Sequence, residues 1–263
     1  MVLNNVLNQQ INNKEVLEAK NIFAIDYLKV KVEITNNPLE LSQNMVIPLT
    51  KFDGEFQPLQ ESYSKQWVCG SYNDHIQIKA INKNEILIHG NLFKWLNGQN
   101  VTGTTDLIQL VLDTVNRLSQ IFNAITPTDT EIENIKLGLF RIYRIDVNKA
   151  LLFDDKQKAQ QYLSSIKEHG TYPRRDREVE NNGIYFGKGS KRTTLLYYFK
   201  GQEIRSHNKQ QTTLTTELRE YADRMIRCEV RLFNQQLRDQ ELNYGYCWNE
   251  ELVKHLVEDS HSK

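Results

Sequence analysis

Two adjacent tyrosines followed by a lysine form the part of the sequence best suited to chemistry. They lie in Thr193–Lys200, whose alternating pattern predicts a β-strand. Because successive side chains of a strand point to opposite faces, Tyr198 and Lys200 share one face and Tyr197 points to the other. A tyrosine beside a cation is placed to meet a phosphate. We therefore take Tyr198 as the candidate nucleophile, Lys200 as its candidate catalytic partner and Tyr197 as the alternative nucleophile.

Three acidic residues could help such a tyrosine through a metal ion. A phenol has an ordinary pKa of about 10, so a nucleophilic tyrosine needs a cation, a base or a metal nearby. Asp26, Asp146 and Glu229 carry hard oxygen ligands of the kind that bind Mg²⁺ or Mn²⁺. A divalent ion would offset their mutual repulsion and stabilise charge on a scissile phosphate. These residues are the predicted metal set, with Mg²⁺ or Mn²⁺ as the cofactor.

Arginines accompany these acids on two predicted strands. The run Met225–Phe233 alternates so that Arg227, Glu229 and Arg231 share one face. In Leu137–Val147, Arg144 and Asp146 likewise share a face. These arginines could clamp the nonbridging oxygens of a phosphate. The alternative is an ordinary solvated surface of the sheet.

Asp26 begins a further predicted strand, Ile22–Ile34. Its parity groups it with the apolar Leu28 and Val30 rather than with the polar positions. An acid on that side needs a partner or an edge position.

The segment from Lys167 to Lys209 is locally basic and contains interleaved tyrosines. Cations that follow phosphates and aromatic faces that stack on bases suit a single nucleic-acid strand. The alternative is a solvated basic surface without a ligand. The candidate phosphate-binding or DNA-binding residues of this segment are Arg174, Arg175, Lys188, Lys191 and Arg192.

Composition sets the class of protein but not its partner. The 263 residues are 39% hydrophobic and 25% charged, which is typical of soluble globular proteins, and the net charge of zero gives no global sign of nucleic-acid binding. Residues 1–20 do not resemble a signal peptide, and no apolar run reaches membrane-spanning length. Three widely spaced cysteines suggest reduced thiols rather than a disulfide framework. We expect a cytoplasmic protein with no membrane partner.

The elements that must position these residues follow from periodicity and turn signals. An antiparallel hairpin is predicted from two alternating runs joined by a polar turn. Strands joined by short turns, with helices between groups of strands, predict an α+β fold with a largely antiparallel central sheet flanked by helices. The predicted strands are Ile22–Ile34, His75–Ala80, Glu85–His89, Leu137–Val147, Gly183–Phe186, Thr193–Lys200 and Met225–Phe233, and the predicted helices are Val6–Lys20, Thr104–Phe122, Asp155–Lys167, Leu214–Arg224 and Asn249–Glu258.

Five strings follow one another along the chain: Ile25–Asp26, NVTGTTDL at Asn100–Leu107, RID at Arg144–Asp146, RTTLLYYFK at Arg192–Lys200 and RCEVRL at Arg227–Leu232. Together they resemble strings of the gene II replication proteins of filamentous phages and related plasmid rolling-circle initiators. Each string alone is weak, but their joint order over about residues 25–233 is more specific. Register within the fourth string makes Tyr198 the nicking tyrosine and Lys200 the lysine two positions later.

The resemblance implies a nicking domain related to the HUH endonucleases. It implies site-specific, metal-dependent DNA nicking and joining through a 5′-phosphotyrosine, with a free 3′-OH left as primer. The implied partners are a replication origin, as a single strand or hairpin, and host helicase and polymerase, in a bacterial cytoplasm. We divide the chain into an N-terminal helical extension (residues 1–21), a nicking endonuclease domain (22–235) and a C-terminal helical tail (236–263).

Two departures keep alternatives open. The paired His-x-His motif of the wider HUH group is missing, as expected only if carboxylates replace it. His75 and His89 remain candidate ligands, although a lone histidine on a strand is more often structural. The chain also stops soon after the nicking domain. The alternatives are a mobilisation relaxase or single-strand transposase, and a non-catalytic DNA-binding regulator of the same fold.

Overall fold

The structure is a computed structural model that describes residues 21–42, 44–47, 49–53, 55–58, 62–70, 74–206 and 214–262. The helix predicted at Val6–Lys20 lies outside these residues. So does the predicted N-terminal extension, except for residue 21, which starts the first strand.

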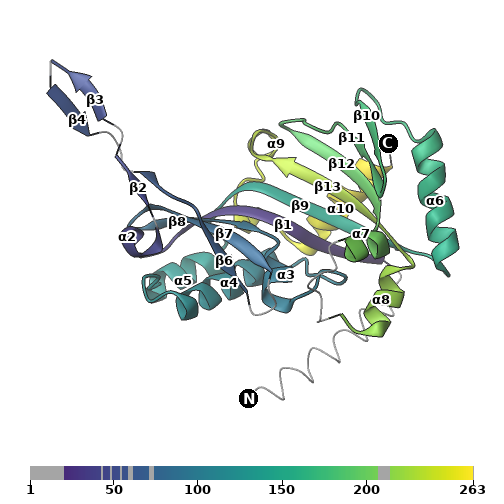
Figure 1. Cartoon of the computed structure of the whole chain (residues 1–263), viewed down its shortest axis with the longest axis horizontal. Helices are drawn as coiled ribbons and strands as arrows, with labels where there is room; N and C mark the ends of the chain where they lie inside the picture. The colour runs from purple at the N-terminus through teal and green to yellow at the C-terminus, as the bar shows by residue number, and fades with distance from the viewer. Residues whose placement is uncertain are drawn as a thin grey trace.

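A large antiparallel sheet dominates the described part of the chain (Figure 1). Every neighbouring pair in it is antiparallel. Helices flank it, so the predicted fold class is confirmed. In spatial order its nine strands are β10 (Arg177–Glu180), β11 (Gly183–Phe186), β12 (Thr193–Phe199), β13 (Met225–Phe233), β9 (Arg141–Leu152), β1 (Asn21–Glu33), β8 (Glu85–Gly90), β7 (His75–Asn82) and β6 (Gln66–Cys69).

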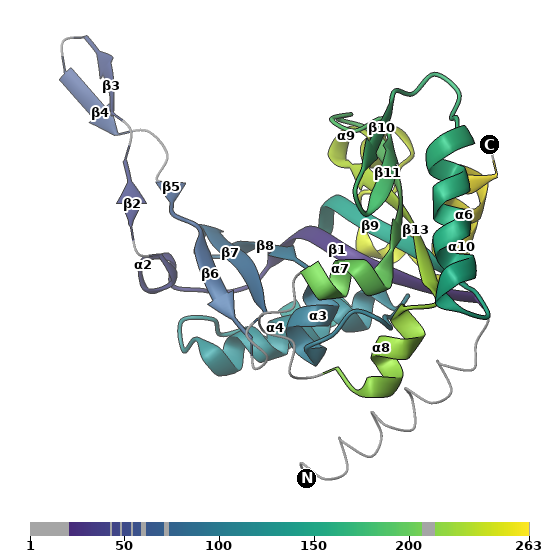
Figure 2. The same cartoon turned by 45° about the vertical axis from the view of Figure 1, so that its right-hand side comes forward.

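Helices cover both faces of the sheet. Helices α6 and α10 lie on one face of the β11–β13 half, whereas α7 and α8 lie on the other (Figure 2). Among the described residues no helix is both long and apolar enough to span a membrane. The helices are α2 (Pro38–Leu41), α3 (Leu92–Asn97), α4 (Leu107–Ile121), α5 (Asp129–Lys136), α6 (Lys156–His169), α7 (Lys200–Ser206), α8 (Thr216–Ala222), α9 (Asn234–Asp239) and α10 (Glu250–His261), with a short 3₁₀ turn at Gly245–Cys247.

Two small two-stranded sheets extend away from the large sheet (Figure 1). One pairs β2 (Met45–Val46) with β5 (Ser62–Tyr63), and the other pairs β3 (Leu49–Phe52) with β4 (Glu55–Pro58). The periodicity of the sequence did not predict them, because such short strands contain too few alternating positions.

Helix α4 forms as its apolar stripe predicts, with Leu110, Val111 and Val115 buried. Its predicted start at Thr104 was wrong. The N-cap is Asp106, whose side chain accepts a hydrogen bond from the backbone N–H of Gln109.

Strand β9 also differs from its predicted bounds, Leu137–Val147. Leu137 is instead the C-cap of α5, and Gly138 follows in the left-handed region at φ 72°. This arrangement ends the helix and delays the strand until Arg141. The strand then continues to Leu152, five residues beyond the predicted end.

The predicted side of Asp26 was wrong, because β1 has a β-bulge at this residue. Ile25 pairs with Val147 on the apolar face, but Tyr27 pairs with Asp146 on the opposite, polar face. Asp26 is the extra residue between them, so the alternation restarts there. The carboxylate thereby reaches the polar face instead of joining Leu28 in the core.

The main core lies on the apolar face of the sheet and includes Val30, Val147 and Val230, each fully buried. A second apolar cluster lies on the opposite face, where Met225 and Ala150 meet α7 and α8. None of the three cysteines forms a disulfide in the structure. The two clusters fix the helices on both sides of the strands that carry the candidate chemistry.

Candidate functional site

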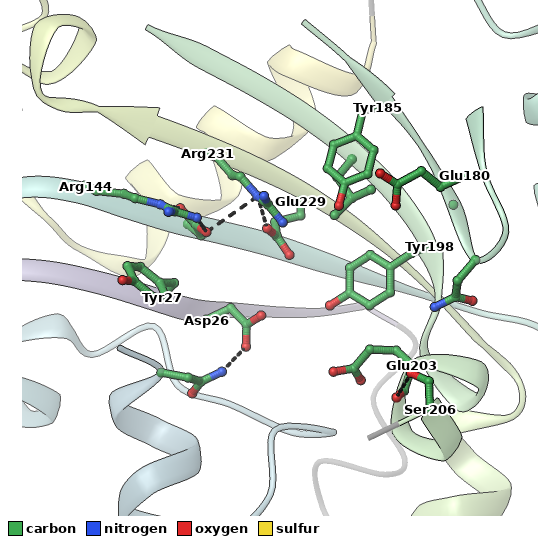
Figure 3. Close-up of a pocket in the computed structure, with 15 residues that line it drawn as sticks. Asp26, Tyr27, Arg144, Glu180, Tyr185, Tyr198, Glu203, Ser206, Glu229 and Arg231 are labelled. Carbon is green, nitrogen blue, oxygen red and sulfur yellow. Dashed lines mark hydrogen bonds and ion pairs between the residues drawn. The ribbon is translucent and has the colours of Figure 1, made fainter. Parts of the chain in front are cut away.

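A pocket of about 410 Å³ opens on the polar face of the sheet. Its walls come from strands β1, β9, β10, β11, β12 and β13, the N-cap of helix α3 and helix α7. Tyr198, Asp26, Asp146 and Glu229 all line it, and Figure 3 shows the tyrosine ring between the carboxylates and α7. The structure therefore brings together the candidate nucleophile and all three predicted acids.

Tyr198 occupies the face that strand alternation predicts. In the sheet it pairs with Arg227 of β13 on one side and Gly183 of β11 on the other. A Cβ at Gly183 would lie 2.4 Å from the carbonyl oxygen of Tyr197 and 3.0 Å from Cβ of Tyr198. Only glycine fits this contact, so β11 closes directly against the tyrosine's strand.

Tyr197, the alternative nucleophile, lies on the opposite face of the sheet. Its ring meets that of His261 of α10 edge-on, with centroids 4.6 Å apart. Burial raises its pKa, with further increases from Cys228 and two tyrosines. It does not line the pocket, so the structure gives it no contact with the predicted acids.

Lys200 is fully buried beside the pocket rather than on its lining. The strand ends one residue earlier than predicted, and Lys200 is the first residue of α7. Its Nζ donates to Oδ1 of Asn100 at 2.9 Å, lies 2.7 Å from Oε2 of Glu203, and lies 6.0 Å from the ring centroid of Tyr198. Burial and the nearby Arg227 lower its pKa, although the two acids beside it oppose this shift.

Arg227 provides the second buried cation next to Tyr198. Its Nη2 donates to the carbonyl oxygens of Asn100 at 2.6 Å and Val101 at 3.2 Å, and its Nη1 lies 3.6 Å from Oδ1 of Asp26. Burial raises the pKa of Tyr198 well above its ordinary value, whereas Arg227 pulls that pKa downward. The phenol is therefore neutral in this state, and the guanidinium favours its ionisation.

The acids of β9 and β13 are neutralised by arginines from the same strands. Arg144 makes a two-pronged contact with Asp146, with distances of 2.8 and 2.6 Å. Arg231 donates to Glu229 at 2.7 Å and lies 3.6 Å from Asp146 (Figure 3). Arg227 is 1% exposed and Glu229 3% exposed, so the alternative of an ordinary solvated surface is wrong for these two residues.

The three carboxylates differ in their electrostatic settings. Burial raises the pKa of Glu229 to about 7, with Asp146 and Asp26 adding to the shift and Arg231 opposing it. Burial likewise raises the pKa of Asp146, despite the contacts of Arg144 and Arg231. Burial would also raise the pKa of Asp26, but nearby cations and the amides of two asparagines hold it below its ordinary value.

The chemistry of this donor set fits a divalent cation, because three oxygen ligands share a pocket and raise one another's energy when ionised. Their present positions do not form a metal centre. Within the described ranges, no group of three or more His, Cys, Asp or Glu side chains is arranged to hold an ion. Arg144 and Arg231 instead occupy oxygens of Asp146 and Glu229. The predicted metal set remains a prediction.

The candidate ligands His75 and His89 are not placed to complete the predicted metal set. His89 uses both ring nitrogens, with Nδ1 2.9 Å from the hydroxyl of Tyr27 and Nε2 against Oε1 of Gln77. Burial and nearby cations lower its pKa to about 4. His75 begins β7 and does not line the pocket. These contacts favour a structural role for His89.

Several residues of the predicted basic segment already form ion pairs or hydrogen bonds within the protein. Lys188 pairs with Glu178 and Glu180, and Nη2 of Arg192 lies 2.5 Å from Asp239. Arg175 donates to the carbonyl oxygen of Thr193 and is partly buried. Arg174, in the left-handed region at φ 58°, and Lys191 are exposed. Their contact with DNA stays a prediction.

Sequence reasoning missed several residues of the pocket wall. Glu203 and Ser206 come from α7, where no helix was predicted, and Tyr185 comes from a predicted strand that was given no acid–base role. Tyr27 directly follows Asp26, and the guanidinium of Arg144 lies 4.3 Å from its ring centroid. An acid three residues after a candidate catalytic lysine was the available signal for Glu203, since i and i+3 meet on a helix.

The family model for the N-terminal part of the phage replication-associated protein, the gene II protein, matches residues 24–251. This chain belongs to that family. The match includes every strand that lines the pocket, and the resemblance to the phage replication proteins is thus confirmed.

One relative is the replication-associated protein of Enterobacteria phage I2-2. It is 26% identical over an alignment of 203 residues that covers 73% of this chain and 58% of that protein. The chain thus spans less than two thirds of this phage relative. A solved rolling circle replication initiator protein from Geobacillus stearothermophilus is 13% identical, with a TM-score of 0.36 over 84% of this chain and 78% of that chain.

Proposed function

We propose that this chain initiates rolling-circle replication by nicking one DNA strand with Tyr198. The observation that carries the proposal is the position of this phenol in one pocket with three acids, beside two buried cations. Membership of the phage replication-associated protein family supports a role in replication. Tyr197 packs on the opposite face against a histidine ring, away from the three acids.

The proposed step is a transesterification. The phenolic oxygen of Tyr198 loses its proton and attacks the phosphorus, forming a bond from tyrosine to the 5′ phosphate. The bond from phosphorus to the 3′ oxygen breaks, and that oxygen takes up a proton to become a 3′-OH primer. Attack by the 3′-OH on the phosphotyrosine reverses the step and rejoins the strand.

Buried cations suit this step because charge develops where water is excluded. Arg227 favours ionisation of Tyr198, and Nζ of Lys200 lies 6.0 Å from the centroid of its ring. We propose that Arg144 and Arg231 transfer part of their pairing from the acids to the phosphate when DNA enters. Arginine forms two-pronged contacts with both carboxylate and phosphate, so this exchange keeps its geometry.

The cofactor that we propose is Mg²⁺ or Mn²⁺, held by Asp26, Asp146 and Glu229. These oxygens have the chemistry that either ion prefers. When bound, the ion supplies positive charge that stabilises the scissile phosphate. Binding requires that the acids release their arginine partners, which a phosphate would also favour.

The test is incubation of the protein with a supercoiled plasmid that carries the origin of its own replicon, with Mg²⁺ or Mn²⁺. We expect open-circular DNA and a protein–DNA adduct that survives SDS. Both products should disappear with a chelator and in Tyr198→Phe. Adduct formation that persists in Tyr198→Phe but is lost in Tyr197→Phe would move the nucleophile to the other face of the sheet.

The same assay separates the proposal from its rivals. DNA binding without any adduct would identify a regulator of the same fold. An adduct formed only on single-stranded transfer or transposon-end DNA would identify a relaxase or transposase. We expect neither outcome for the origin of a rolling-circle replicon.

A further inference from the structure

Asn100 lies where charged groups from three elements meet: the half-buried Asp26 and the buried Lys200 and Arg227. Its Nδ2 donates to Oδ1 of Asp26 at 3.0 Å, and its Oδ1 accepts from Nζ of Lys200 at 2.9 Å. Its backbone carbonyl oxygen accepts from Nη2 of Arg227 at 2.6 Å. The residue is itself only 8% exposed. One asparagine therefore contacts β1, α7 and β13 at once.

An amide is suited to this position because it both donates and accepts. The Asp26 carboxylate requires a donor, whereas the Lys200 ammonium requires an acceptor. A carboxylate in place of the amide could serve only Lys200, and an ammonium could serve only Asp26. The neutral side chain also connects an acid and an ammonium without adding charge beside two buried cations.

The loop that carries Asn100 is held rigidly. Gly98 ends α3 at φ 73°, and Oε1 of Gln99 accepts from the backbone N–H groups of Val101 and Thr102 at 2.7 and 3.1 Å. A Cβ at Gly103 would lie 2.4 Å from Cβ of Ala24, so the loop packs directly on β1. These contacts hold the backbone on both sides of Asn100.

A second amide supports the same acid. Nδ2 of Asn91 donates to Oδ1 of Asp26 at 2.6 Å, and its Oδ1 caps α3 through the backbone N–H of Lys94 at 2.8 Å. Within the part of the chain that the structure describes, Asn91 has a hydrogen bond to Asp26 but none to Lys200 or Arg227. Asn100 differs because it connects the acid to both cations that flank Tyr198.

We propose that Asn100 is a positioning residue for strand nicking, which fixes the Asp26 carboxylate and the Lys200 ammonium relative to Tyr198. This inference rests on the proposed function. It adds that the loop at residues 98–104, which does not line the pocket with any side chain, sets the geometry of the reacting groups. A displacement of about 1 Å at such a site can reduce a rate about 100-fold.

The test measures the rate of adduct formation against DNA concentration, using a single-stranded oligonucleotide that contains the nick site. In Asn100→Ala we expect the rate at saturating DNA to fall roughly 10- to 100-fold. The half-saturating DNA concentration should change by less than about threefold, because Asn100 does not line the pocket that receives the substrate. Asn100→Asp should be at least as slow, since its carboxylate repels Asp26. Asn100→Gln, which keeps both hydrogen-bonding groups, should recover part of the rate.

Asn36→Ala is the matched control for the loss of a buried amide. Asn36 is 6% exposed, and its side-chain amide donates to the backbone oxygens of Ile34 and Asn82, at 2.9 and 3.0 Å. This variant should lose thermal stability but nick at the wild-type rate. If Asn100→Ala loses stability to a similar extent and keeps the wild-type rate, Asn100 is merely structural and the inference is overturned.

An NMR measurement separates failure of this inference from failure of the proposed function. The ¹⁵Nζ resonance of Lys200, assigned with Lys200→Arg, should shift in Asn100→Ala and stay fixed in Asn36→Ala. An unchanged resonance would overturn the inference that Asn100 positions Lys200, even if the wild type nicks DNA. A shifted resonance without any adduct in the wild type would reject nicking but keep the link between Asn100 and Lys200.

Discussion

Tyr197 and Tyr198 are neighbours in the chain yet lie in opposite environments. Tyr197 packs edge-on against His261 of α10, on the face that α6 and α10 cover. Tyr198 lies on the other face, in a pocket with three acids. Burial raises the pKa of both phenols, but only at Tyr198 does an arginine oppose the shift.

The same contrast continues into the neighbouring strand. Arg227 lies beside Tyr198, whereas Cys228 lies beside Tyr197 on the apolar face. In both strands, the alternation of side chains therefore places apolar packing on one face of the sheet and charged groups on the other. The face that a tyrosine occupies therefore sets its surroundings, which differ although the residue type is the same.

The largest expected effect distinguishes the two tyrosines directly. Tyr198→Phe removes the attacking oxygen, so its nicking rate should fall at least about 1,000-fold. Tyr197→Phe should stay within about threefold of wild type, because its hydroxyl does not reach the pocket. The measurement is the initial rate of adduct formation on supercoiled DNA. Equal losses in the two variants would contradict the division between the faces.

A second comparison uses the pair in β13. Arg227→Lys has a single nitrogen and cannot contact the carbonyls of Asn100 and Val101 while placing a second nitrogen near Asp26, so we expect about a 100-fold slower nicking rate. Cys228→Ala removes a buried thiol from the other face, with a cost of about 1 kcal/mol in the free energy of unfolding and little change in rate. Nicking rates and denaturant unfolding curves check both. A fully active, folded Arg227→Lys would show that this cation is not needed.

A third effect is the pH dependence of stability on the charged face. Folding raises the pKa of Glu229 from its ordinary value of 4.5 to about 7. Its stabilising contribution is therefore complete below pH 4.5 and is lost as the pH rises through 7. Between pH 5 and 8 the free energy of unfolding should therefore fall by about 1–2 kcal/mol less in Glu229→Gln than in the wild type. Urea unfolding without metal measures it, and parallel pH profiles in variant and wild type would reject the shift.

The smallest expected effect concerns one histidine on each face. Burial lowers the pKa of both His89 and His261 from 6.5 to about 4. The stability that each neutral ring contributes is present above pH 6.5 and is lost as the pH falls toward 4. His89→Gln and His261→Gln should each reduce the acid-induced loss by less than about 1 kcal/mol. Only His89→Gln should also alter nicking, because His89 contacts Tyr27 of the pocket. An altered nicking rate in His261→Gln would contradict the separation of the faces.

Local alternation was enough to place Tyr198 and the β13 acid correctly. The side chains at residues 227, 229 and 231 share a face because β13 is regular over its whole length. The position of Asp26 could not be predicted in this way. Its bulge depends on the register between β1 and β9, which are more than a hundred residues apart in the chain. Alternation describes one strand and carries no information about its partner.

The contacts that support the pocket residues were even harder to predict from the sequence. Asn100 was noticed only as part of a string, since its three partners lie 74, 100 and 127 positions away in the chain. The extension of β12 to Lys200 was wrong because the chain turns into α7 at that residue. Hydrogen bonds over such separations arise from the completed sheet, so no local pattern reports them.

The pairing of cations with acids has a consequence for how salt should affect DNA binding. Lys188 and Arg231 each contact a glutamate, and Arg192 contacts Asp239. Because such a cation is already paired, it neutralises less phosphate charge and releases fewer of the cations condensed on the DNA. For single strands the logarithm of affinity falls with that of salt concentration by about 0.7 per phosphate neutralised. Here the slope should be much shallower than the number of nearby basic residues implies, and binding should persist at ionic strengths that release proteins with unpaired basic surfaces.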